Sequence, residues 1–247
     1  MSHYGSFCDD FFLNLSLHTE MELPSSREPV LHFFEQIRKS YPQMRNFYAR
    51  ERGEYVLEED KDGDRYAWTA VERRRVLSGS ANPASEDDAL AQHALVLDVL
   101  PYALSVTPLD CESLNLTYEF DYTYRGNHNQ LVAEALGMAP ALEKLFETPG
   151  AALVTYEPSV QFTWSEDCRV QARLGVETRT SPYHIRTGEY PEEQFSIYLT
   201  GRRFGGLERG ESFVDAMRQL NGFCRDLLES SVIDHVLRPV QQAIVIK

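Results

Sequence analysis

The sequence predicts an α+β protein in which one or two antiparallel sheets carry helices packed on one face. Three observations support this fold class. Several segments alternate strictly between apolar and polar residues, as strands with one buried face do. Amphipathic segments with a helical period lie between them. The same order of segments recurs in both halves of the chain, which predicts a duplicated β-α-β-β-(β)-α unit.

The first half opens with a strand over 11–21, in which alternate residues from Phe11 to Leu17 are apolar. A helix with one apolar face follows and ends at Pro42. Two alternating stretches, at about 44–58 and 65–78, are expected as strands joined by an acidic turn. A helix over about 85–100, capped by Ser85, completes the unit.

The second half repeats this order. A strand at 114–124 precedes a helix at about 128–146, which Gly137 and Pro140 can divide into two. Strands are expected at about 154–164, where Val160, Phe162 and Trp164 share the parity of the buried face, and at 170–176. A further strand at 195–200 has no counterpart in the first half, and a long helix over 211–237 follows.

A shift of 105 residues places Leu17 on Tyr122 and Val71 on Val176. The alternative is a single α+β domain whose elements happen to recur. The expected organisation is an N-terminal arm at 1–10, a first repeat at 11–104 and a joint at 105–111. A second repeat at 112–247 ends in the long helix and an apolar tail.

Composition narrows the range of partners. The 247 residues carry a formal charge of −14, which disfavours binding to nucleic acid or to anionic lipid. No apolar run approaches the length of a membrane-spanning helix, and the first twenty residues lack a signal-peptide pattern. Cys8, Cys111, Cys168 and Cys224 are scattered, which favours reduced thiols and a cytoplasmic location.

Gly126-Asn127-His128 lies where a predicted strand meets a helix. It resembles the metal-ligating Gly-Asn-His of calcineurin-like metallophosphoesterases. That family also needs an Asp-x-His, a Gly-Asp and a later Gly-His, and the chain has only Gly63-Asp64, in an acidic turn. The segment is therefore interpreted as a corner, in which Gly126 supplies a positive φ and Asn127 caps the helix. Neither a metal nor a cofactor is expected.

The sequence contains no serine-hydrolase elbow, phosphate loop or His-Glu-x-x-His motif, so no catalytic residue is assigned. The segment 178–194 is the longest without periodicity, and such loops often bind ligands. A glycine-rich stretch at 201–211 could bind an anion through its arginines. The candidate binding residues are Tyr183, His184, Arg186, Tyr190, Arg202 and Arg203.

The expected function is that of a cytoplasmic, non-enzymatic binding or assembly protein that self-associates or binds a protein partner. The apolar run Ala243–Ile246 follows Pro239, which is expected to break the last helix, so the tail should dock on the protein or on a second subunit. The alternative is a small-molecule-binding protein or enzyme with a Tyr/His/Arg-lined pocket between sheet and helices. Tyrosines expected on the buried strand faces suggest it: Tyr118, Tyr122, Tyr124, Tyr156 and Tyr198.

Overall fold

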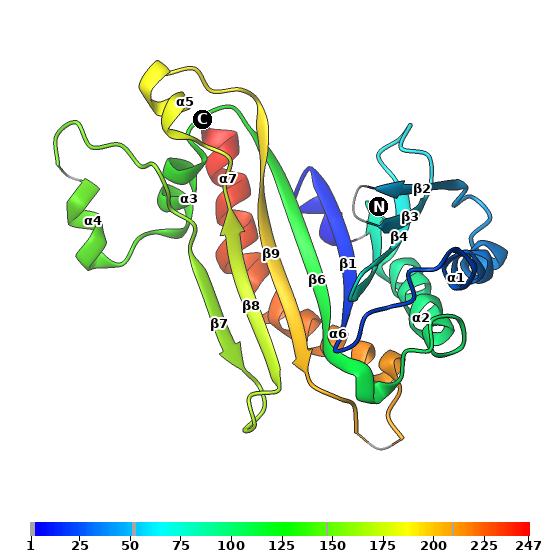
Figure 1. The fold of residues 1–247 in the computed structure, drawn as a ribbon. Helices are drawn as coiled ribbons and strands as arrows, with labels where there is room; N and C mark the ends of the chain where they lie inside the picture. Colours follow the sequence, from blue (N-terminus) through cyan, green and yellow to red (C-terminus); the bar gives the residue numbers. More distant parts are fainter. Residues whose placement is uncertain (1–2, 51–52, 147, 209) are drawn as a thin grey trace.

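The computed structural model describes residues 3–50, 53–146, 148–208 and 210–247. Within them the chain forms an antiparallel sheet of nine strands in the order β2-β3-β4-β5-β1-β6-β9-β8-β7 (Figure 1). The strands are β1 (Asp10–Thr19), β2 (Asn46–Arg50), β3 (Glu54–Glu58), β4 (Tyr66–Glu72), β5 (Arg75–Ala81), β6 (Cys111–Tyr124), β7 (Ser159–Thr163), β8 (Val170–Glu177) and β9 (Glu193–Phe204). The predicted α+β class with an antiparallel sheet is confirmed.

The helices of the described residues are α1 (Arg27–Ser40), α2 (Glu86–Ala103), α3 (His128–Leu136), α4 (Pro140–Phe146), α5 (Pro182–Thr187), α6 (Phe213–Leu227) and α7 (Arg238–Ile246). Helices α2 and α6 pack directly on one face of the sheet, α1 packs against α2 and α3 packs against α7, while α4 and α5 lie in the connections between strands, outside this layer (Figure 1). A π-helical segment (Leu228–Leu237) joins α6 to α7, and short 3-10 turns lie at Tyr4–Ser6 and Pro108–Asp110. The helix α6 covers β6 and β9, α2 covers β5 and β1, and the two helices contact each other.

The core lies between the helices and the two central strands. Phe11, Leu13, Leu15 and Leu17 of β1 are buried, and the intervening residues are only half-buried on the other face. Alternate residues of β6 from Leu114 to Tyr122 are buried on the same face as those of β1. Burying each large apolar side chain contributes roughly 1.5–3 kcal/mol, which fixes the strand register.

The strand expected at 195–200 is part of a longer strand in the structure. It belongs to β9, which lies beside β6 as β5 lies beside β1. The stretches 44–58 and 65–78 are not single strands. Each is a hairpin, turning near Gly53 and at Arg73-Arg74. The turn at Arg73-Arg74 contains no glycine, asparagine or aspartate, the residues that usually form two-residue hairpin turns, so the sequence pattern does not reveal it. The duplication itself stays a prediction.

Two further expectations about local structure are wrong. The segment 178–194, expected to lack regular structure, contains the helix α5, with Ser181 at its N-cap and Pro182 in its first turn. The strand expected at 154–164 is limited to β7, because the chain before Ser159 runs past α3 instead. There the Asn129 side chain bonds the backbone of Val154 and Tyr156.

The C-terminal tail is helical. Pro239 does not end the helix but lies in the first turn of α7, where its missing N–H costs little. Val240 is buried and α7 packs against α3. Val245 and Ile246 are 81% and 84% exposed, so these two residues do not dock on their own chain, and their docking on a second subunit stays a prediction. Among the described residues, no helix has both the length and the apolar character needed to cross a membrane.

Candidate functional site

Three of the six predicted binding residues come together in the connection between β8 and β9. Tyr183, His184 and Tyr190 line a pocket of about 740 Å³, and Arg125 and Glu189 complete its polar wall. The His184 ring meets the rings of Tyr183 and Tyr190 edge-on, at centroid distances of 6.1 and 6.3 Å. The side chains therefore form one continuous aromatic and polar surface.

Local structure accounts for much of this arrangement. The Nδ1 atom of His184 accepts a bond from the Ser181 N–H at 3.4 Å, which stabilises the start of α5. The guanidinium of Arg186 lies 5.6 Å from the centre of the Tyr183 ring, and Arg186 is not among the residues that line the pocket. His184 and Arg186 thus contribute to holding the short helix α5 together.

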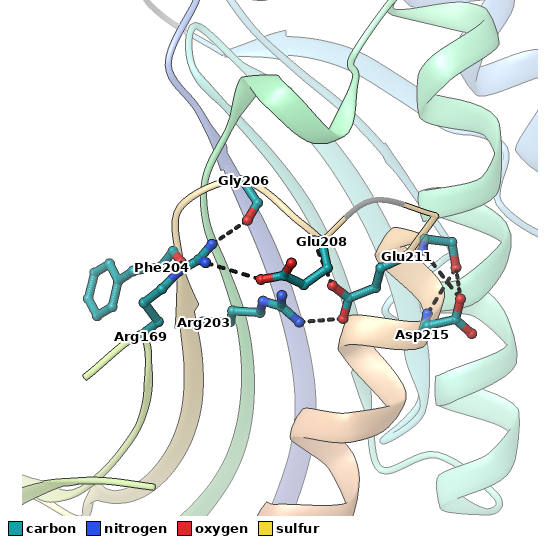
Figure 2. Close-up of polar contacts among 8 residues, drawn as sticks. Arg169, Arg203, Phe204, Gly206, Glu208, Glu211 and Asp215 are labelled. Carbon is teal, nitrogen blue, oxygen red and sulfur yellow. Dashed lines mark hydrogen bonds and ion pairs between the residues drawn. The ribbon is translucent and has the colours of Figure 1, made fainter. Parts of the chain in front are cut away.

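The other two predicted residues, Arg202 and Arg203, lie at the opposite end of β9 and on opposite faces of the sheet. Arg203 points to the helix face, where it forms an ion pair with Glu211 at the start of α6 (Figure 2). Both side chains are about nine-tenths buried. The charge of Arg203 is therefore neutralised within the chain, and of the two arginines only Arg202 faces solvent on the helix-free face.

The glycine-rich segment after β9 is held by Arg169, which sequence reasoning did not identify. Its guanidinium donates to the carbonyls of Phe204 and Gly206 and faces Glu208 (Figure 2). At the far end of the segment, Ser212 and Asp215 form a reciprocal cap for α6. These contacts join the β8 hairpin, the end of β9 and the start of α6.

The Gly126-Asn127-His128 segment is a helix-capping corner. The Asn127 side chain accepts from the Gln130 N–H, as expected of an N-cap. Both ring nitrogens of His128 are engaged, Nε2 with the Tyr124 carbonyl at 3.1 Å and Nδ1 with the Arg179 N–H at 3.2 Å. The stated role of Gly126 is wrong, since its φ is not positive. A Cβ there would lie 2.5 Å from the Tyr124 ring.

The tyrosines expected around an internal pocket belong largely to the packed core. Tyr118 and Tyr122 are buried, and the Tyr118 hydroxyl lies 2.5 Å from a Glu86 oxygen and 2.6 Å from Asn221 Oδ1. Burial, with Glu86 beside it, raises the pKa of Tyr118. Tyr198 was expected on the helix face and lies on the other one, because its neighbours Ile197 and Leu199 are the residues that lie beside the core residues Phe120 and Tyr118 of β6.

On the helix-free face, the centre of the sheet is polar and partly buried. Burial, followed by the charge of Asp121, raises the pKa of Glu119 to about 7. The Asn14 side chain donates to Glu119 at 2.8 Å. Burial also raises the pKa of Tyr198, the residue opposite Glu119 on β9, to about 12. These groups hold protons that ordinary surface carboxylates and phenols would release more readily.

The edge strand β7 presents an apolar row that sequence reasoning assigned to the core. Val160 and Trp164 are 58% and 38% exposed on the helix side of the sheet, and Phe162 lies between them. The Trp164 ring stacks on Phe223 of α6 at a centroid distance of 5.2 Å. The apolar spacing marks these residues as facing inward, but only the strand order shows that β7 lies at an edge.

Comparison with known proteins gives no functional assignment. No family model matches the chain, and no curated protein matches it. Among solved structures, an alkyldihydroxyacetonephosphate synthase is similar at 11% identity and a TM-score of 0.19. The match covers 95% of this chain and 43% of that one. A likeness this weak supports no argument about fold or activity.

Proposed function

We propose that the chain is a non-enzymatic binding and assembly protein that associates with a second copy of itself along β7. The observation that carries the proposal is the uncharged edge of β7, whose sequence is Ser-Val-Gln-Phe-Thr. Figure 1 places β7 at the left margin of the sheet, with β8 on one side. A free strand edge of this kind is a template for pairing with another strand.

The backbone of β7 supports pairing in one register. The Trp164 N–H donates to the Val170 carbonyl at 2.8 Å, and the Pro158 carbonyl accepts from the Val176 N–H at 3.1 Å. Even-numbered residues therefore direct their backbone groups toward β8. Since alternate residues of an antiparallel ladder point in opposite directions, the groups of Ser159, Gln161 and Thr163 point outward.

An antiparallel second copy can satisfy all of these outward groups at once. With Gln161 opposite Gln161 of the second copy, Ser159 of each chain lies opposite Thr163 of the other. The same register places Val160 opposite Phe162 on the helix side, so the apolar rows of the two chains continue each other. A two-fold axis through Gln161 describes this arrangement, and two-fold dimers are the commonest soluble oligomers.

Charge favours this surface for self-association. The chain carries a formal charge of −14, so most surfaces of two copies repel each other. β7 has no charged residue, and its self-paired register opposes no like charges. The other edge strand, β2, contains Arg50 and follows Arg45, which is paired with Asp60. Charged residues of this kind protect an edge against pairing.

As part of this proposal we place the protein in the cytoplasm. Its four cysteines are unpaired thiols, with Cys111 and Cys224 buried, which suits a reducing compartment. Fractionation of cells that produce the tagged chain tests this point, and recovery with secreted or membrane material would contradict it.

Sedimentation velocity over a wide range of concentration tests the assembly. The wild-type chain should show a concentration-dependent dimer, and Gln161→Lys should be monomeric because two ammonium groups would face each other across the axis. Gln161→Glu should be monomeric for the same reason. An equimolar mixture of these two variants should recover the dimer, since opposite charges then face each other.

Tyr102→Lys is the matched control, because Tyr102 is 88% exposed on α2. This helix covers β5 and β1, and three strands separate β1 from β7 in the sheet. It should dimerise like the wild type. A wild-type chain that stays monomeric at every concentration would refute the proposal. A dimer that survives in Gln161→Lys would place the interface elsewhere.

A further inference from the structure

The helix-free face of β8 and β9 carries two arginines on neighbouring strands. Arg173 of β8 lies opposite Thr200 of β9, and Arg202 of β9 lies opposite Gln171 of β8. The two arginines are therefore diagonal neighbours on one face, a spacing of roughly 7–8 Å between strand positions. Long side chains reach across such a separation.

Each guanidinium uses its Nε atom to bond a neighbouring side chain. Arg202 Nε donates to Asn115 Oδ1 at 2.7 Å, and Arg173 Nε donates to Ser159 Oγ at 3.0 Å. Arg202 also lies 5.5 Å from the centre of the Phe204 ring. In the part of the chain that the structure describes, neither arginine has a carboxylate at ion-pair distance, unlike Arg203 and Arg169. Their terminal nitrogens are thus positioned without being neutralised.

The two side chains line one small hollow. A pocket of about 90 Å³ is bounded by Arg173, Arg202, Thr200 and the amides Gln161 and Gln171. It adjoins a larger pocket of about 290 Å³, which shares Arg173 and Thr200. Gly175 and Tyr198 also line the larger pocket, and Gly175 adds no side chain that would fill it.

We propose that this hollow binds an oxyanion head group, a carboxylate or a phosphate, between Arg173 and Arg202. Two guanidinium forks match the planar or tetrahedral oxygens of such groups and make charge-assisted hydrogen bonds. The smaller pocket suits the head group, and the larger one takes the rest of a small ligand.

The surrounding charges limit which charged groups the ligand can carry. Beyond Arg202 lie His18 and Arg75, the latter paired with Glu72. Burial, followed by the positive charge of Arg75, lowers the pKa of His18; Arg202 acts in the same direction, and Glu112 and Glu72 act against it. At the other end of the larger pocket lie Glu157 and Glu177, the latter paired with Arg179. A second anionic group would be repelled there, so the ligand carries one oxyanion on a neutral or cationic body.

Calorimetric titration with inorganic phosphate, and separately with acetate, tests the site at constant ionic strength. Saturable binding of either anion is expected, and the stronger of the two identifies the head group. Arg173→Gln and Arg202→Gln should each weaken binding by about tenfold or more, since each removes a charged hydrogen-bonding partner. Arg202→Lys keeps the charge without the fork and should also bind more weakly.

Arg186→Gln is the control, because it removes the same charge on α5, outside both pockets. Its affinity for the anion should equal that of the wild type. Circular dichroism shows whether each variant is folded, and exposed Arg173 is a substitution that the fold should tolerate. The proposal is overturned if neither anion binds saturably, or if folded Arg173→Gln binds as tightly as the wild type.

Discussion

Arg203 at the end of β9 and Glu211 before α6 form an ion pair whose side chains are only 9% and 11% exposed. The second oxygen of Glu211 accepts from the Glu208 N–H at 3.0 Å. The pair thus connects the sheet to the helix that covers it. A buried pair of this kind gives little net stability by itself, but removing one partner leaves a buried charge without compensation.

Glu211→Gln should therefore destabilise the fold by about 3 kcal/mol, measured by urea denaturation at neutral pH. Glu208→Gln is the control, because the Glu208 side chain is 74% exposed and its pair with Arg169 should contribute at most about 1 kcal/mol. Equal effects of the two substitutions would show that the buried pair has no special role.

The free energy of unfolding should depend on pH because His93 is buried. It lies fully buried on α2, where Nδ1 is 2.8 Å from Ser78 Oγ, and burial lowers its pKa from about 6.5 to about 3. The unfolded chain takes up this proton below about pH 6.5 and the folded chain does not. The stability that neutral His93 provides is therefore complete above that pH and decreases as pH falls toward 3.

Between pH 7 and pH 5 the loss from this one residue should be about 2 kcal/mol. Denaturation curves of the wild type and of His93→Gln measure it, because the variant lacks this titration. The difference in unfolding free energy between the two proteins should shrink as pH falls. A difference that is constant across this pH range would mean that His93 does not titrate as inferred.

Gly79 and Trp68 form a cross-strand pair between β5 and β4. The indole lies over the glycine so closely that a Cβ on residue 79 would stand 2.0 Å from the ring. Gly79→Ala should displace Trp68 and cost roughly 1–3 kcal/mol. Tryptophan fluorescence in a Trp164→Phe background should report the displacement.

Gly63→Ala provides the comparison, because no heavy atom lies within 4 Å of a Cβ at that position. It should leave both stability and fluorescence nearly unchanged. If Gly79→Ala also leaves stability and fluorescence unchanged, the position of the Trp68 indole does not depend on the absence of a side chain at residue 79.

Much of the local structure could be predicted from the sequence because it depends on short-range chemistry. The alternation in β1 and β6 identified the buried face of each strand, and Ser85 accepts from the Asp88 N–H as a helix cap should. The interruption at Gly137 and Pro140 separated α3 from α4. Each of these signals involves residues within a few positions of one another.

The candidate sites depended on pairing between distant strands, which no local pattern encodes. Periodicity assigned Val160, Phe162 and Trp164 to an inward face, but only the order of strands made β7 an edge and left that face partly uncovered. Likewise the grouping of Arg202 with Arg203 followed from adjacency in the chain. Consecutive strand residues face opposite ways, so the sheet separated the two. Its register instead brought Arg202 close to Arg173.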